Sequence, residues 1–131
     1  MKPAVLLAAA ALLVAGPALA QNAGQIASVR GGASCAGCNL FQADLGNLTL
    51  KNKNLSRARL RQAEMSAAIL NGTNFSGADL RDVNAYGALF TGANFSGAEM
   101  DRASGLTQSQ LNRACGDEST RLPNGMRIPN C

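Results

Sequence analysis

The middle of the chain, residues 38–103, repeats one hydrophobic pattern every five residues. An apolar residue occupies every fifth position, and a small residue, most often Ala, stands two positions before most of these residues, with Lys53 as a charged exception. The residues between and after these positions are mostly polar, charged or Gly. The apolar positions are Leu40, Leu45, Leu50, Leu55, Leu60, Met65, Leu70, Phe75, Leu80, Ala85, Phe90, Phe95 and Met100.

A period of five fits neither a single helix nor a single strand. An α-helix turns about 100° per residue, so the large residues would be spread around the whole cylinder. A strand alternates faces at every residue, so every second large residue would face the wrong way. A coil that turns a corner after each short extended piece brings all of them inside. The Asn, Ser and Gly residues between the pieces suit such corners.

A second period of twenty residues lies over the first. The triplet Asn-Leu-Ser at 54–56 recurs as Asn-Phe-Ser at 74–76 and at 94–96. Twenty residues are four pentapeptides, which predicts a four-sided coil whose matched residues stack about 4.8 Å apart. Recent duplication of the sequence, without stacking, is the alternative.

The pentapeptides resemble the pentapeptide repeat family, whose motif is A-(D/N)-L-x-x. The clearest matches are Ala-Asp-Leu-Gly-Asn at 43–47, Ala-Asp-Leu-Arg-Asp at 78–82 and Ala-Asn-Phe-Ser-Gly at 93–97. The resemblance implies an all-β fold, a right-handed quadrilateral β-helix of a little over three coils, which we expect over residues 35–105. Each unit of such a repeat fold buries its apolar face only by stacking on its neighbours.

The first twenty residues have the features of a signal peptide. Lys2 supplies a positive start, residues 4–15 are apolar, and Ala-Leu-Ala at 18–20 is a cleavage site. The apolar run is too short to span a membrane, which takes about 20 residues. Gln21, rather than Cys, follows the cut, which argues against a lipid anchor. We therefore expect a periplasmic or secreted protein with no membrane insertion after cleavage.

The segments on either side of the repeat lack its pattern. Residues 21–34 are rich in Gly, Ala and Ser without periodicity, which predicts a flexible leader. Thr107 and Gln110 form a capping-box pattern, which predicts a short helix from 108 to about 114 that covers the last coil. The C-terminal region 106–131 is thus expected to be a cap followed by an irregular, disulfide-bonded tail.

Four cysteines, Cys35, Cys38, Cys115 and Cys131, allow three disulfide connectivities. Cys38 and Cys115 would lie at opposite ends of the stack, too far apart for a bond, so Cys35–Cys38 and Cys115–Cys131 are favoured. Export favours the oxidised state. A redox-active pair or a metal site are the alternatives for the C-x-x-C pair, but no helix pattern follows it and the chain has no His.

The outward positions differ from side to side of the expected coil. One side predicts a ladder of opposite charges: Arg59, Asp79 and Glu99, with Arg61, Arg81 and Asp101 beside them. A second side stacks Asn and Ser. A third side presents Thr49, Ile69 and Leu89, a candidate contact surface, although single apolar residues are common on protein surfaces. Inside the coil, Ala85 replaces a large residue and predicts a small void that Phe90, Tyr86 or Val83 could fill.

These observations favour a non-catalytic exported repeat protein, a structural or protein-binding module. The chain without residues 1–20 has eleven basic and eight acidic residues, and it has no His, no G-x-S-x-G and no phosphate-binding Gly loop. We expect no catalytic residues, no cofactor and no metal, and a protein as the partner; the sequence specifies no oligomeric state.

Two other functions follow from particular features. Cys35 and Cys38 could serve a thiol–disulfide redox protein. The resemblance also implies DNA mimicry, since some members of the family are acidic rods that bind DNA gyrase, but this chain is basic, short and, as we expect, exported. Nucleic-acid binding through Arg57, Arg59, Arg61 and Arg81 is opposed by the acids between them, so we expect no nucleic-acid partner.

Overall fold

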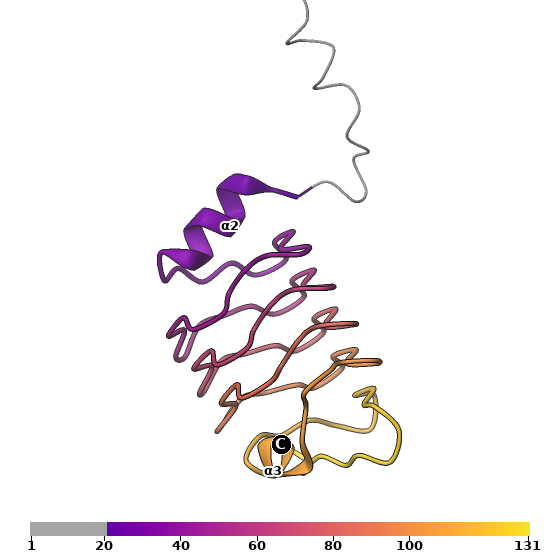
Figure 1. Ribbon diagram of the computed structural model, residues 1–131. Helices are drawn as coiled ribbons and strands as arrows, with labels where there is room; N and C mark the ends of the chain where they lie inside the picture. The colour runs from indigo at the N-terminus through magenta and orange to yellow at the C-terminus, as the bar shows by residue number, and fades with distance from the viewer. Residues whose placement is uncertain (1–20) are drawn as a thin grey trace, which may run out of the picture.

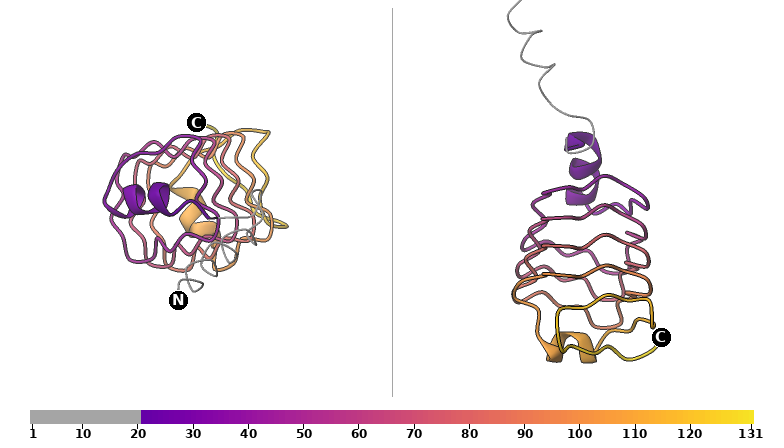
Figure 2. Two further views of the ribbon diagram at one scale, coloured as in Figure 1. Left: turned by 90° about the horizontal axis from the view of Figure 1, so that it is seen from above. Right: turned by 90° about the vertical axis from the view of Figure 1, so that its right-hand side faces the viewer.

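The repeat region forms a stack of square coils. A computed structural model describes residues 21–131, and the expected signal peptide at 1–20 lies outside them. Three extended residues alternate with a two-residue turn through residues 38–103. Seen along the stack, the coils superpose, and seen from the side they lie one above another (Figures 1 and 2). Short parallel bridges join residues twenty positions apart, which is the stacking that the second period predicts.

The bridges define four walls, which we name after their outward residues. The charged wall is Asn39, Arg59, Asp79 and Glu99. The carboxylate wall is Asp44, Glu64, Asn84 and Ser104. The apolar wall is Thr49, Ile69 and Leu89, and the asparagine wall is Asn54, Asn74 and Asn94. Along the chain the walls follow one another in this order, so the apolar wall lies opposite the charged wall.

Backbone hydrogen bonds between coils hold the walls and corners. On the charged wall, Leu60 N donates to Asp79 O at 2.8 Å and Asp79 N donates to Ala58 O at 3.0 Å. At the corners, the second turn residue has a positive φ, such as 60° at Asn47 and 68° at Gly77. Gly and Asn adopt this conformation most readily, which explains their frequency at these positions.

The inside of the stack is a continuous apolar core. All thirteen residues of the five-residue pattern are at most 2% exposed. Phe75 and Phe95 stack at 5.2 Å between ring centroids, and Phe90 meets Phe95 edge-on at 5.1 Å. Burial of each large side chain stabilises the fold by about 1.5–3 kcal/mol. Tyr86 does not fill the space at Ala85, because its side chain is 71% exposed.

Residues 21–34 are not an unstructured leader, and that prediction is wrong. Residues Ala23–Arg30 form helix α2, which begins at Asn22, whose side chain accepts a hydrogen bond from Gln25 N. Val29 is fully buried and Ile26 packs beside it against the core of the coil. A helix of eight residues is unstable alone, so its contacts with the first coil must stabilise it.

Two polar contacts also join α2 to the first coil. Gln25 Oε1 accepts a hydrogen bond from Asn39 N at 2.7 Å. Arg30 donates from Nη1 to Asp44 O. Figure 1 shows α2 lying across the open end of the stack.

At the other end, helix α3 spans Gln108–Asn112, fewer residues than we expected. The tail beyond it is not wholly irregular, and that prediction is wrong in part. Cys115 bridges to Asn94 and Arg121 bridges to Glu99, so the coil continues on two walls. The chain reaches these bridges with spacings of 21 and 22 residues, because α3 replaces an extended piece and shifts the register. The shifted register hides this last turn from a five-residue pattern.

Candidate functional site

The candidate contact surface is one straight column. Thr49 bridges to Ile69, and Ile69 bridges to Leu89, so the structure brings the three predicted residues together on the apolar wall. Thr49 is exposed, Ile69 is half-buried and Leu89 is 49% exposed. Apolar exposure therefore increases toward the C-terminal end of this wall.

An open hollow adjoins Leu89 at that end. It is lined by Tyr86, Gly87, Ala88, Leu89, Gly105, Thr107 and Gln110. Tyr86 and Leu89 are the exposed large apolar residues of the part of the chain that the structure describes. Sequence reasoning missed Tyr86 as a surface residue. The signal was its corner position, which Gly46 and Ser66 occupy in the preceding coils.

Helix α3 forms one border of the hollow and is tied to the coil by Gln110. Thr107 and Gln110 form the expected capping box. The side-chain amide of Gln110 also donates to Ala85 O at 2.9 Å and to Ala88 O at 2.7 Å. Gly105 lets the chain pass close to Tyr86, because a Cβ at Gly105 would lie 2.7 Å from three Tyr86 atoms. The shape of the hollow is thus fixed by the close backbone contact at Gly105 and by the Gln110 amide, which donates to two carbonyl groups.

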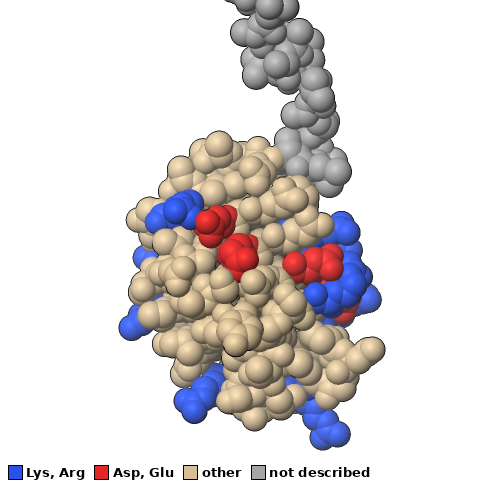
Figure 3. All heavy atoms as spheres, in the orientation of Figure 1, with Lys and Arg blue, Asp and Glu red and all other residues tan. Residues whose placement is uncertain are grey.

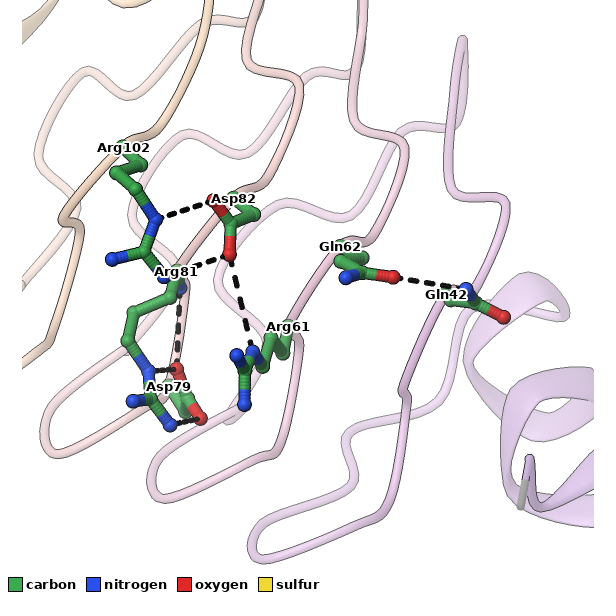
Figure 4. Close-up of polar contacts among 7 residues, drawn as sticks. All are labelled: Gln42, Arg61, Gln62, Asp79, Arg81, Asp82 and Arg102. Carbon is green, nitrogen blue, oxygen red and sulfur yellow. Dashed lines mark hydrogen bonds and ion pairs between the residues drawn. The ribbon is translucent and has the colours of Figure 1, made fainter. Parts of the chain in front are cut away.

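The charged wall and its corner carry a network of ion pairs, but with other partners than the sequence predicts (Figure 4). Arg81 pairs with Asp79 in its own coil, at 2.7 Å. Asp82 pairs with Arg102, whose Nε lies 2.8 Å from Asp82 Oδ1. Arg61 Nε lies 3.9 Å from Asp82 Oδ2. Asp101 pairs with Arg121 at 3.0 Å. Arg59 makes no ion pair with the described residues.

Two of these contacts favour the charged forms of Asp79 and Asp82. The hydrogen bond from the Arg81 side chain lowers the pKa of Asp79, and the same contact raises the pKa of Arg81. The hydrogen bond from the Arg102 side chain lowers the pKa of Asp82. A carboxylate that stays ionised beside a guanidinium cannot act as a proton donor near neutral pH, so this cluster is suited to structure or binding.

Basic and acidic atoms gather in a few places on the surface. In Figure 3 one mixed cluster lies at the right edge and a smaller one at the upper left, and most of the remaining face is uncharged. Glu64 is held by its neighbours on the carboxylate wall: the hydrogen bond to the Ser66 side chain lowers its pKa, and Asn84 Nδ2 donates to it at 3.1 Å. No strongly basic or acidic groove results on this face.

The four cysteines form two disulfides, Cys35–Cys38 and Cys115–Cys131, with Cα atoms 5.5 and 4.7 Å apart. These are the pairings that the sequence favours. Cys38 is 7% exposed and extended backbone follows it, whereas a reactive cysteine usually lies at the start of a helix. Cys131 is exposed, and Ser96 Oγ and Asn94 Oδ1 lie 3.5 and 3.4 Å from its sulfur.

Residues 21–131 show neither a metal-binding cluster nor a membrane-spanning helix. His, Cys, Asp and Glu nowhere gather there in threes that could hold a metal ion. Neither α2 nor α3 has the length and apolar character to cross a bilayer.

Comparison with known protein families identifies the family of the repeat region. The model of pentapeptide repeats matches eight copies over residues 38–77 and 68–104, which together cover more than half of the chain. The chain belongs to the pentapeptide repeat family. Pentapeptide repeat proteins fold as right-handed quadrilateral β-helices, and the four walls described above are the sides of that helix.

Solved structures of pentapeptide repeat proteins are similar to this chain. The crystal structure of alr5209, a pentapeptide repeat protein from Nostoc, has 29% identity and a TM-score of 0.70, over 82% of this chain and 88% of that one. A pentapeptide repeat protein of the Arabidopsis thaliana thylakoid lumen has 22% identity and a TM-score of 0.30, over 86% and 68%.

A third structure belongs to a protein with a described role. QnrB1, a plasmid-mediated fluoroquinolone resistance protein, has 19% identity and a TM-score of 0.31, over 70% of this chain and 63% of that one. A search of curated proteins found no match.

Proposed function

We propose that this pentapeptide repeat protein is a non-catalytic, exported binding module that contacts a protein partner through the apolar wall and the adjoining hollow. The observation that carries the proposal is the position of Tyr86 and Leu89. They are 71% and 49% exposed, and both line the same hollow. Large apolar side chains that share one exposed patch are typical of protein contact sites.

The scaffold is suited to hold such a surface rigidly. Repeat folds present extended walls whose shape is set by neighbouring units. Helices α2 and α3 lie at the two ends of the stack, where an uncovered edge would add further strands. We propose that both helices act as caps, so that the molecule meets partners with its walls.

The sequence supports the other parts of the proposal. It contains no His and none of the common nucleophile motifs, which supports a binding rather than a catalytic role. The signal-peptide features of residues 1–20 support a periplasmic or secreted location. In that location the two disulfides would be maintained.

Photo-crosslinking tests the contact surface. A photoreactive residue at position 91, beside the apolar wall, is expected to capture a discrete partner in the exported fraction. Leu89→Lys or Ile69→Lys should abolish this adduct, because an ammonium group would be desolvated in the contact. Gln62→Lys, at an exposed corner away from this wall, is the control with the same change of charge. An adduct that survives both wall substitutions would contradict the proposal.

A further inference from the structure

The asparagine wall has a charge pattern unlike the rest of the molecule. We include its two corners, so that four successive coils contribute residues 31–37, 51–57, 71–77 and 91–97. These 28 positions contain no Asp or Glu, and their only charges are Lys51, Lys53 and Arg57. The charged wall, in contrast, mixes both signs in one network. The last turn, which continues this wall through Cys115, adds Asp117 and Glu118, and Asp117 accepts a hydrogen bond from Gly97 N. The positive potential of the wall is therefore concentrated on the N-terminal coils, where no acid offsets it.

Two of these three cations, Lys51 and Arg57, are exposed and available to a ligand. Lys51 and Arg57 are exposed at the two corners of the wall, and Lys53 is half-buried between them. None of the three forms an ion pair with a described residue. Arg57 extends over the next coil, because its Cγ lies 3.3 Å from the position that a Cβ on Gly77 would take. The positive charge thus spans the width of the wall and more than one coil.

The same wall also presents a column of amide donors. The side-chain oxygens of Asn54, Asn74 and Asn94 accept hydrogen bonds from the backbone two residues later, at 3.0, 2.9 and 2.9 Å. This bond fixes each side chain. The three Nδ2 groups make no hydrogen bond with residues 21–131. Stacked coils repeat these donors about every 4.8 Å.

We propose that the asparagine wall binds an anionic polysaccharide, a chain of sugars that carry carboxylate or sulfate groups. The cations attract the acidic groups, and charge-assisted hydrogen bonds to them are among the stronger polar contacts. The amide column donates to sugar hydroxyl and ring oxygens along the polymer. This wall adjoins the apolar wall without sharing its column, so the inference is independent of the protein contact proposed above.

The wall lacks what other anionic ligands require. Single-stranded nucleic acid is held by bases stacked on exposed aromatic rings, but Phe75 and Phe95 are buried here and Tyr86 lies at a corner of another wall. A lipid surface would need apolar side chains to enter it, and the outward residues of this wall are polar. The observations therefore favour a sugar polymer.

Titration calorimetry with polygalacturonate tests the proposal on the purified protein at low salt. We expect binding that weakens as salt is added. Lys51→Gln/Arg57→Gln should weaken binding about tenfold. Arg30→Gln/Arg61→Gln removes the same charge away from this wall, beside Asp44 and Asp82, and should bind like the parent protein. Equal losses in both double variants would overturn the assignment to this wall, as would an absence of binding.

A second pair of variants tests the amide column. Asn74→Asp keeps the oxygen that accepts from Ser76 N but replaces the donor with a negative charge, so binding should be lost. Asn47→Asp makes the same change at an exposed corner on the far side and should have no effect. Polyglutamate and single-stranded DNA serve as competitors. If either binds as tightly as polygalacturonate, the polysaccharide assignment is overturned in favour of an acidic protein or nucleic acid.

Discussion

Arg81 donates to both carboxylate oxygens of Asp79, from Nε at 2.8 Å and from Nη2 at 2.7 Å. The two residues lie in the same coil, two positions apart, whereas the stacked neighbour of Asp79 toward the N-terminus is Arg59. Asp79 therefore pairs with Arg81 at the adjacent turn of its own coil, and not with the stacked Arg59 of the preceding coil. The planar guanidinium matches the carboxylate, which makes this a bidentate pair, as is that of Arg102 with Asp82.

The pair makes stability depend on pH. Because Arg81 lowers the pKa of Asp79 in the folded protein, the folded state binds that proton less readily than the unfolded chain does. The contribution is present above the ordinary pKa of about 4 and is lost as the pH falls through the lowered value. We expect Asp79→Asn to be less stable than the parent protein at pH 7, and the difference to shrink at lower pH. Urea unfolding from pH 7 to pH 2 measures it.

A double-mutant cycle isolates this pair from the rest of the wall. Asp79→Asn, Arg81→Gln and the double variant should give a coupling free energy of up to about 1 kcal/mol at pH 7, as expected for a largely surface pair. The coupling should approach zero near pH 2. A coupling that is equal at both pH values would show that the contact is not the source of the pH dependence.

Gly105 should be intolerant of a side chain. Its φ is +72°, and an added Cβ would lie 2.7 Å from the Tyr86 backbone. We expect Gly105→Ala to lower the free energy of unfolding by more than about 2 kcal/mol, from left-handed strain plus the collision. Gly125→Ala is the matched control: φ is +79°, but no atom lies within 4 Å, so only the strain of about 1–2 kcal/mol applies. Thermal unfolding distinguishes the two, and equal effects would disprove the collision.

Helix α2 should stabilise the first coil through Val29. This side chain is fully buried, and its truncation leaves a gap under the helix. We expect Val29→Ala to cost about 1–3 kcal/mol and to increase hydrogen exchange in the first coil. Ser28→Ala, exposed on the same helix, should change the stability by no more than about 0.5 kcal/mol. Unchanged exchange in Val29→Ala would mean that α2 does not protect the coil.

The two disulfides should contribute unequally. Cys115 and Cys131 are 16 positions apart, so their bond closes a long loop, whereas Cys35 and Cys38 are three apart. In the chain-entropy model a loop of about 15 residues contributes roughly 3 kcal/mol, and a much shorter loop contributes less. We expect Cys115→Ala/Cys131→Ala to lower the melting temperature more than Cys35→Ala/Cys38→Ala does. The reverse order would show that the tail bridge contributes little to stability.

The sequence by itself determined the coil and the identity of its walls. Every fifth apolar residue from Leu40 to Met100 is buried, and residues twenty apart, such as Thr49 and Ile69, stack. Both results could be predicted because every coil repeats the same local structure, an extended piece followed by a corner. The period of five residues therefore identifies the buried residues of the whole core. The candidate contact column followed from the same period.

Only the tertiary structure decided the ends, the side-chain partners and the exposed aromatic. Helix α2 depends on burial of Val29 against the first coil, which no local pattern encodes. The last turn, at Arg121, is displaced in register by α3. Arg81 pairs with Asp79, and the side chain of Tyr86 points outward. The conformation of a long side chain depends on the space and the partners around it, and the repeat period does not specify these. A sequence period predicts the positions at which the backbone conformation repeats. It does not predict the caps, which form where the repeat ends, or the ion pairs, whose side chains are long enough to reach more than one coil.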